Sequence, residues 1–239
     1  MGAAEASGPD YSGALENGVR RVVARALPDI NGERLDALMA ELFGLADSAL
    51  AALVAKDPPR RAIACKAGCA YCCIVYVQVT PLEALHVARS ILARPAAEVT
   101  AVRQRVAAAH ATTVGRDSDY RIVLAQPCPL LVDGRCSVYA DRPFACRGAN
   151  SADANACRDA FANPDGPLLP TFIHQSKTYA ALGHGAAKGL SDTGTHPTLL
   201  ELIAALHLAL AHDDPLAAWR SGDLDFTSAR CVMAKHEQS

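Results

Sequence analysis

The chain has 239 residues, of which 51% are hydrophobic, 20% are charged and only 5% are aromatic. That length can bury a real core, as one large domain or two small ones, and the composition excludes a disordered tail. The formal net charge of -2 argues against nucleic-acid binding, because a protein that neutralises phosphates carries a basic surplus.

Neither a targeting segment nor a membrane span is expected. Residues 1–10 lack the basic flank and the apolar run of a signal peptide. The best apolar runs, 49–55 and 202–211, are much shorter than the roughly 20 residues that cross a bilayer. We therefore expect a cytoplasmic protein with no membrane partner, in a compartment where thiols stay reduced.

The chain before the first cysteine is expected to be helical. Residues 14–27 predict one helix, and Asn31 can cap a second whose apolar positions recur with helical period as far as Leu53. The segment Asp57-Pro58-Pro59 ends the second helix, because proline lacks the backbone donor and clashes with the preceding turn.

The central part mixes short strands with helices. Residues 74–79 and 121–124 are rich in β-branched residues and predict two short strands. Between them Thr80 and Glu83 have the spacing of a capping box, which starts a helix. Pro95 interrupts that helix, and apolar residues continue the helical spacing beyond it.

The dipeptide Asp133-Gly134 predicts a β-hairpin, because it suits a tight turn with positive φ. A two-residue turn sets Cys136 opposite Leu131 and Cys128 opposite Tyr139, and it makes Tyr139 a packing residue of the hairpin. Cys128 and Cys136 then point to opposite faces and can belong to different metals, unless the proline between them breaks the strand and lets them converge.

Helices are expected again after the cysteines, over residues 171–190 and 198–212, and Thr198 with Glu201 is a second candidate capping box. The histidines lack the i, i+4 spacing of a helical zinc site, and each is expected to be isolated. The glycines at 183, 185 and 189 have the wrong spacing for a dinucleotide loop. No phosphate-binding loop or serine-nucleophile elbow is present in the sequence.

Together these elements predict a mainly α protein with a small irregular α+β cysteine-rich metal-binding core. We expect an N-terminal helical region over 1–60, a cysteine-cluster domain over 61–160 and a C-terminal helical region over 161–239. The cysteine-rich segment has little apolar surface of its own, so the metal is expected to replace part of its core.

Eight of the nine cysteines fall into two groups of four along the sequence: Cys65, Cys69, Cys72 and Cys73, and then Cys128, Cys136, Cys146 and Cys157. In a reduced compartment such clustering indicates metal or redox chemistry. Four thiolates close a tetrahedral zinc site or hold one iron–sulfur cluster. We therefore predict that all eight are metal ligands and that the ninth, Cys231, is an ordinary buried thiol.

Two features of the clusters bear on how they bind. Side chains of neighbours such as Cys72 and Cys73 point apart in an extended chain, so one of them can serve a second metal or be a spare reactive thiol. The negative charge of a four-thiolate site can be offset by cations close in sequence, among which Arg142 and Arg147 are candidates for the shell around the ligands. Lys66 and Arg135 also lie close.

The motifs resemble those of the YkgJ-like cysteine-cluster family. The resemblance is carried, over roughly residues 61–160, by Cys65-Lys66-Ala67-Gly68-Cys69-Ala70-Tyr71-Cys72-Cys73, Thr80-Pro81-Leu82-Glu83, Cys128-Pro129-Leu130-Leu131, Gly134-Arg135-Cys136 and Val138-Tyr139-Ala140-Asp141-Arg142-Pro143-Phe144-Ala145-Cys146-Arg147, with Cys157 as the last family cysteine. The family is described as a zinc- or iron-chelating domain. Some members are associated with lysine N-methylation of flagellin, where an iron–sulfur cluster has been proposed. The resemblance implies metal binding, but not methyl transfer, since no S-adenosylmethionine site is identifiable.

Three other functions stay open. The spacing Cys65-x3-Cys69-x2-Cys72 resembles the cluster loop of radical S-adenosylmethionine enzymes, although few strands are predicted for their βα units. Surplus cysteines also suit a thiol redox or metal-delivery protein. A structural zinc module that displays helices to a protein partner is the third. Zinc, iron and a [4Fe-4S] cluster are all candidate cofactors, because thiolates suit each of them.

Overall fold

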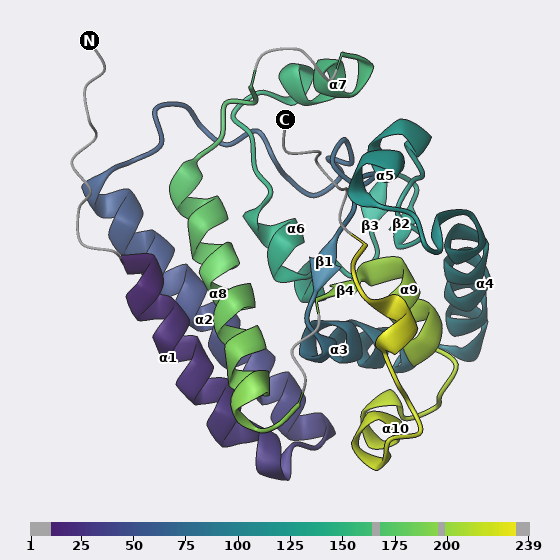
Figure 1. The fold of residues 1–239 in the computed structure, drawn as a ribbon. Coiled ribbons are helices and arrows are strands. Elements are labelled where there is room, and N and C mark those ends of the chain that lie inside the picture. The colour runs from purple at the N-terminus through teal and green to yellow at the C-terminus, as the bar shows by residue number, and fades with distance from the viewer. Residues whose placement is uncertain (1–10, 164–167, 196–198, 233–239) are drawn as a thin grey trace, which may run out of the picture.

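The computed structural model describes residues 11–163, 168–195 and 199–232 (Figure 1). As predicted, the described chain is mainly α with a small α+β part. Its α-helices are α1 (Tyr11–Ala26), α2 (Gly32–Lys56), α3 (Pro81–Leu92), α4 (Ala96–Thr113), α5 (Ser118–Leu124), α6 (Phe144–Gly148), α7 (Ala154–Ala162), α8 (Ile173–Asp192), α9 (Leu202–Ala209) and α10 (Pro215–Ser221). Short 3-10 turns are η1 (Leu27–Asp29), η2 (Tyr139–Asp141) and η3 (Thr227–Ala229). Two antiparallel pairs of strands join β1 (Gln78–Val79) to β4 (Leu200–Glu201) and β2 (Leu131–Val132) to β3 (Arg135–Cys136).

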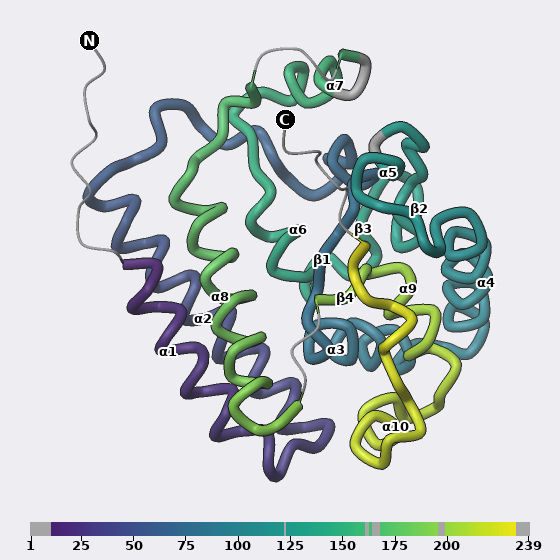
Figure 2. Tube along the Cα trace, in the orientation of Figure 1, coloured from purple at the N-terminus to yellow at the C-terminus, as the bar shows by residue number. Residues whose placement is uncertain are grey.

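Helices α1, α2 and α8 pack side by side and form one half of the molecule (Figures 1 and 2). Two glycines of α8 allow the close approach of α1. A Cβ atom added to Gly185 would lie 2.5 Å from the carbonyl oxygen of Glu16, and one on Gly189 would lie 2.7 Å from that of Arg20. Gly185 and Gly189, two of the three glycines that do not fit a nucleotide loop, are therefore required by a helix–helix contact.

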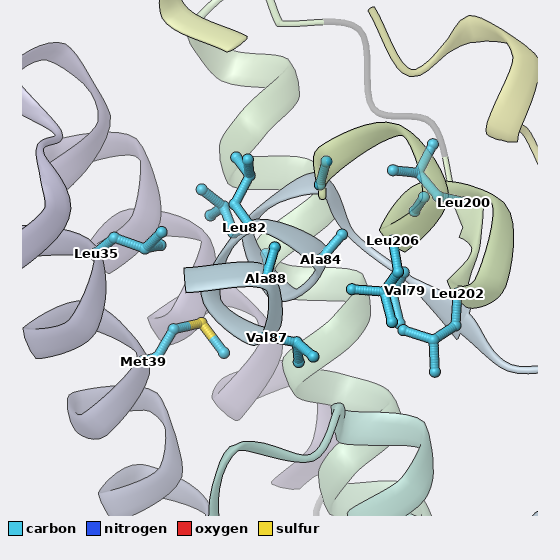
Figure 3. Close-up of a cluster of buried hydrophobic side chains, with 14 of the residues drawn as sticks. Leu35, Met39, Val79, Leu82, Ala84, Val87, Ala88, Leu200, Leu202 and Leu206 are labelled. Atoms are coloured by element: carbon cyan, nitrogen blue, oxygen red, sulfur yellow. The ribbon is translucent and has the colours of Figure 1, made fainter. Parts of the chain in front are cut away.

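The other half contains α3, α4, α9 and α10, joined to the first half through the core. Figure 3 shows Leu82, Ala84 and Ala88 of α3 between Leu35 and Met39 of α2 and the leucines of the β4–α9 segment. One hydrophobic core thus contains residues from all three regions expected from the sequence. The domain limits at 60 and 160 stay a prediction.

Helix α2 is long and apolar enough to cross a membrane by length and composition alone: it has 25 residues and a mean hydropathy of 1.7 over an 18-residue window. The two apolar runs considered in the sequence are much shorter than this helix. In the structure Leu35, Met39 and Leu42 of α2 are buried in the core. Only 22% of that window is buried inside the molecule, and length and composition alone do not assign a membrane role.

Two predicted elements are wrong. Residues 121–124 belong to helix α5 and not to a strand. The Asp117 side chain accepts the Tyr120 backbone N–H at 2.9 Å, which stabilises the first turn of a helix, and β-branched residues with no strand to pair with have no reason to extend. The strand expected over 74–79 is restricted to Gln78–Val79, since the residues before it form turns.

The second helix expected after the cysteines, over 198–212, begins later than predicted. Glu201 is itself the N-cap of α9, because its Oε2 accepts the Ala204 N–H at 2.7 Å. The partner proposed for it in a capping box, Thr198, lies outside the described residues. Residues 200–201 instead pair with β1, with Gln78 opposite Glu201. This pairing places the start of α9 beside the end of the cysteine-rich loop.

Candidate metal centre

The first four cysteines lie in a chain of tight turns between α2 and β1. Gly68 has φ +91°, a conformation that suits glycine, and it lies in a turn closed by the Cys69 N–H and the Lys66 carbonyl at 3.0 Å. A second turn joins the Cys73 N–H to the Ala70 carbonyl at 3.0 Å. The Cys73 carbonyl then accepts the Cys128 N–H at 2.7 Å, which brings the two sequence groups together.

The buried Glu83 carboxylate positions Cys146. Its Oε2 accepts the backbone N–H and the hydroxyl of Thr80, both at 2.8 Å, which completes the predicted capping box of α3. Its Oε1 accepts the Phe144 N–H at 2.8 Å, at the start of the α6 helix that contains Cys146. Burial raises the pKa of Glu83 to about 6, against the lowering effect of these N–H groups. The Thr-Pro-Leu-Glu motif and the Cys146 motif are therefore one structural unit.

Ser151 brings the first and last clustered cysteines together. Its backbone N–H lies 3.2 Å from Cys65 Sγ and can donate to a thiolate there, while its carbonyl accepts the Ala64 N–H at 2.8 Å. Two residues later Asp153 caps α7, the helix that contains Cys157. Residues 92 positions apart in the sequence are thereby placed side by side.

The cysteines surround a single cavity of about 260 Å³. Seven of the eight predicted ligands line it, namely Cys65, Cys69, Cys72, Cys73, Cys128, Cys136 and Cys146. The eighth, Cys157, is buried and interacts electrostatically with Cys65. The ninth cysteine, Cys231, is not among the lining residues and lies beside the Tyr76 hydroxyl. The structure thus gathers all eight predicted cysteines into one region.

Within this region we divide the thiols into two neighbouring sets by the thiols that influence each of them electrostatically. Burial raises the pKa of Cys65, and the thiols that raise it further are those of Cys69, Cys72 and Cys157. We call these four cysteines the outer set, since Cys72 is exposed at the surface.

The inner set consists of Cys73, Cys128, Cys136 and Cys146. Burial raises the pKa of Cys128 to about 11, with Cys136 as the neighbouring thiol. Burial also raises the pKa of Cys146, which interacts with Cys128, Cys136 and, between the two sets, Cys72. The Cys73 thiol in turn interacts with Cys72, Cys128 and Cys146. Protonated, buried thiols of this kind must lose protons when they bind a metal.

This grouping differs from the order of the cysteines in the sequence, because Cys73 joins the later cysteines and Cys157 joins the earlier ones. The adjacent pair Cys72-Cys73 is divided between the proposed sets. Their thiols are hydrogen-bonded to each other, and this bond lowers the pKa of Cys72 to about 6 and raises that of Cys73. Cys128 and Cys136 converge on the cavity, because the hairpin is only two residues long on each side. The predicted pairing of Cys136 with Leu131 is confirmed.

Several cations lie beside the thiols. Arg142 lines the cavity near Cys72 and Cys136, and its guanidinium lies 4.0 Å from the centre of the Tyr139 ring. Tyr139 is 39% exposed in η2, so the prediction that it packs within the hairpin is wrong. Lys66 also lines the cavity. Arg135 is exposed in β3 and is not among the lining residues.

Arg147 has a different position from the one predicted. Its guanidinium lies 3.7 Å from the centre of the Phe43 ring and its Nε donates to the Arg142 carbonyl at 3.1 Å. These contacts fix α6 against α2 and η2, and Arg147 is not among the residues that line the cavity. It therefore acts on the thiols through the position of α6, which contains Cys146.

Sequence reasoning missed two charged residues of this cavity, Arg121 and Glu201. The sequence predicts a strand for Arg121 and the glutamate of a capping box for Glu201, whereas Glu201 is itself the N-cap of α9. Arg121 is only 2% exposed, Glu201 is also buried, and both influence the Cys128 thiol. The one sequence feature that could have indicated this role was a single arginine at the start of the otherwise apolar run 121–124.

The donor set fits a thiophilic metal group. Thiolates are soft ligands that select zinc, Cu(I) or iron–sulfur clusters. Within residues 11–163, 168–195 and 199–232, however, no three His, Cys, Asp or Glu side chains are gathered into a site for one ion. The sulfurs instead lie around a cavity that also contains cationic side chains.

Residues 64–163 match the CxxCxxCC family model, whose description is a putative zinc- or iron-chelating domain. This is the family that the motifs resemble, and the matched segment contains all eight cysteines of the two sets. No curated protein and no solved structure matches the chain.

Proposed function

We propose that the inner set holds an iron–sulfur cluster, starting from the match of residues 64–163 to the CxxCxxCC model of zinc- or iron-chelating domains. The outer set forms a second four-thiolate centre next to it. Metal binding itself is the role that the family supports. The ligands proposed for each centre come from the neighbourhoods of the thiols.

One observation carries the choice of a cluster for the inner set. A single zinc ion needs its four sulfurs at about 2.3 Å from one point. No such group occurs in the described residues, whereas the four inner thiols are among the seven that line one cavity of about 260 Å³. Cysteines spread around a space suit a group with several metal atoms, each of which binds one thiolate.

The charged surroundings support the same proposal. A cluster with four thiolates is anionic, and its potential depends on nearby charges and hydrogen-bond donors. Arg142 lies near Cys136 and Cys72, and Arg94 lies near Cys136 while it donates to the Ser137 carbonyl at 2.8 Å. These guanidinium groups would stabilise the thiolate forms and orient their backbone supports.

When bound, an iron–sulfur cluster supplies one-electron redox chemistry, or Lewis acidity if one iron is open to a ligand. The chain's own contribution is to hold the thiols and to exclude water. Glu83 fixes the helix of Cys146, and the Cys73 carbonyl fixes the loop of Cys128. We also propose a reducing, cytoplasmic location, because nine free thiols persist only where glutathione or thioredoxin keeps them reduced.

The experiment is elemental analysis for iron, zinc and acid-labile sulfide on full-length protein purified without oxygen. We expect iron and sulfide in equal amounts, about four of each for a [4Fe-4S] cluster. The variant Cys146→Ser should lose the iron and sulfide of the inner centre. The matched control Cys231→Ser should keep both, because Cys231 lies outside the two sets.

The other outcomes contradict the proposal at different levels. Zinc without sulfide would reject the cluster and restore a structural zinc module. A protein free of metal, after expression with added iron and zinc, would reject metal binding and leave thiol redox chemistry as the surviving function. Equal metal loss in Cys146→Ser and Cys231→Ser would reject the assignment of the ligands.

A further inference from the structure

The cavity has a second wall that contains no cysteine. It is formed by Arg121 of α5 and by the first residues of the β4–α9 segment, Glu201, Leu202 and Ile203. The pairing of β1 with β4 holds this segment against the end of the cysteine-rich loop. Neither charged residue is a thiolate or lies within the predicted ligand groups, so their presence needs its own explanation.

Arg121 has donors that the described protein does not use. Its side chain is 2% exposed, and its Nε and Nη1 have no hydrogen-bond partner among the described residues. Its Nη1 lies 3.8 Å from Glu201 Oε1, which is too far for a hydrogen bond. Burial of a guanidinium is costly unless its donors are paired, so unpaired donors in the wall of a cavity point to a ligand.

Glu201 presents the complementary group. Its Oε2 is engaged with the Ala204 N–H at 2.7 Å, while its buried Oε1 has no hydrogen-bond partner within the described residues. The helix cap therefore accounts for one oxygen of this carboxylate, and the other oxygen lies 3.8 Å from Arg121 Nη1. Two N–H groups of Arg121 and one oxygen of Glu201 are thus buried without a hydrogen-bond partner, and the opposite charges lie 3.8 Å apart.

Charge compensation of the thiolates does not account for this pair. An arginine that only offsets thiolate charge is weakened by a carboxylate beside it, and Glu201 Oε1 lies 3.8 Å from Arg121 Nη1. The two charges oppose each other, so the pair adds little net charge to the inner set. Neighbouring opposite charges suit a ligand that itself has adjacent opposite charges.

We propose that this cavity binds a small α-amino acid, with its carboxylate on Arg121, its ammonium group on Glu201 and an apolar side chain against Leu202 and Ile203. Ligand sites combine an apolar lining with a few convergent polar groups in this way. The proposal rests on the cavity and its charged pair and goes beyond metal binding. It places an amino-acid subsite beside Cys128 of the inner set.

The test is calorimetric titration of the full-length protein, with its metal content measured on the same sample. The probes are L-valine, isovalerate, which lacks the ammonium group, and isobutylamine, which lacks the carboxylate. We expect L-valine to bind and each of the other two to bind at least about tenfold more weakly, because each leaves one buried charge without its partner. No binding of L-valine, or equal binding of isovalerate, overturns the proposal.

Variants separate the two charged groups. Arg121→Gln should lower the affinity for L-valine and for isovalerate by at least about tenfold, since both carry the carboxylate. Glu201→Gln retains an acceptor for the Ala204 N–H, and it should weaken L-valine to the level of isovalerate without changing isovalerate. Arg20→Gln, which removes an exposed arginine paired with Asp192 in the other half of the molecule, is the matched control and should change neither.

Failure of this inference is distinguishable from failure of the metal proposal. A protein with iron and sulfide that does not bind L-valine keeps the metal centre and loses the subsite. A protein without metal that binds L-valine through Arg121 and Glu201 keeps the subsite, because neither residue is a proposed ligand. If Arg121→Gln does not fold, as judged by circular dichroism, the probe series on the unaltered protein still decides the outcome.

Discussion

The division of the cysteines into an inner and an outer set can be tested by metal counts in paired variants. Sequence order places Cys73 with Cys65, whereas the proposed grouping places Cys73 with Cys128 and Cys146, which influence its thiol. Each set contains four thiols, the number that holds one centre. Loss of a single ligand, as in Cys73→Ser, should therefore remove one centre and leave about half of the metal if the centres are alike.

The double variants give opposite expectations for the two groupings. In the structure Cys73→Ser combined with Cys146→Ser disrupts one centre, so the metal content should stay near that of Cys73→Ser alone. Cys73→Ser combined with Cys65→Ser disrupts both centres and should remove nearly all of the metal. The non-additivity of the first pair is the signature of residues that act as one unit.

The assay is metal and sulfide per chain, measured on protein prepared without oxygen and shown by circular dichroism to retain its helices. Cys231→Ser, alone and combined with Cys73→Ser, is the control for the loss of a thiol outside both sets. The reasoning is refuted if the combination with Cys65→Ser retains the metal of Cys73→Ser and the combination with Cys146→Ser loses it. That result would restore the grouping by sequence order.

Three further predictions concern the scaffold. Gly189→Ala should lower the free energy of unfolding in urea by about 1–2 kcal/mol, because overpacking against α1 exceeds the helical gain of alanine. A Cβ atom on Gly183 would meet nothing within 4 Å, so Gly183→Ala should raise the free energy of unfolding by up to about 1 kcal/mol. Equal effects of the two substitutions would contradict this prediction. Glu83→Gln should lower the free energy of unfolding by about 1–3 kcal/mol and speed the loss of metal to a chelator, because the new amide group must face the N–H of Thr80 or of Phe144. Unchanged stability and unchanged metal retention would reject this prediction. Burial and His207 lower the pKa of His110 in the fold, so the unfolded chain takes up this proton first and stability falls as pH drops below about 6.5. Melting curves at about pH 7.5 and 5.5 should show a smaller fall for His110→Gln, and an identical fall would reject this coupling.

Features fixed by short-range contacts were predictable from the sequence. Asn31 caps α2 by accepting the Arg34 N–H at 3.0 Å, and the Thr80–Glu83 box forms as its spacing requires. Asp133 and Gly134 both adopt positive φ in the turn between β2 and β3. In each case the interacting groups lie within a few residues of one another, so a local pattern contains the information.

Features fixed by long-range contacts were not predictable in the same way. The second role of Glu83, at the Phe144 N–H, depends on a contact over 61 positions. The outer set depends on Ser151, 86 positions from Cys65. The histidines at 110 and 207 were expected to be isolated, yet their rings stack with centroids 4.2 Å apart, because α4 packs on α9. No periodicity or spacing records such pairings.

The family motifs acquire a physical reason only when these long-range contacts are included. Thr-Pro-Leu-Glu follows the first group of cysteines closely but lies far from Cys146 in the sequence, and its glutamate nevertheless fixes the helix of Cys146. A change at Glu83 therefore alters the metal centre without touching a ligand. Supports of this kind are expected around metal sites, because ligand orientation depends on the groups that hold the ligands.

The adjacency of Cys72 and Cys73 couples the two proposed centres. One peptide unit joins a ligand of the outer set to a ligand of the inner set, and the Cys73 carbonyl also holds the Cys128 N–H. A displacement of Cys72 at the exposed outer centre must therefore move the backbone that supports the inner centre. Thiols of both sets line the cavity that also contains Arg121 and Glu201, and Cys72 of the outer set is exposed as well. We therefore expect a change of ligands at one proposed centre to affect the other.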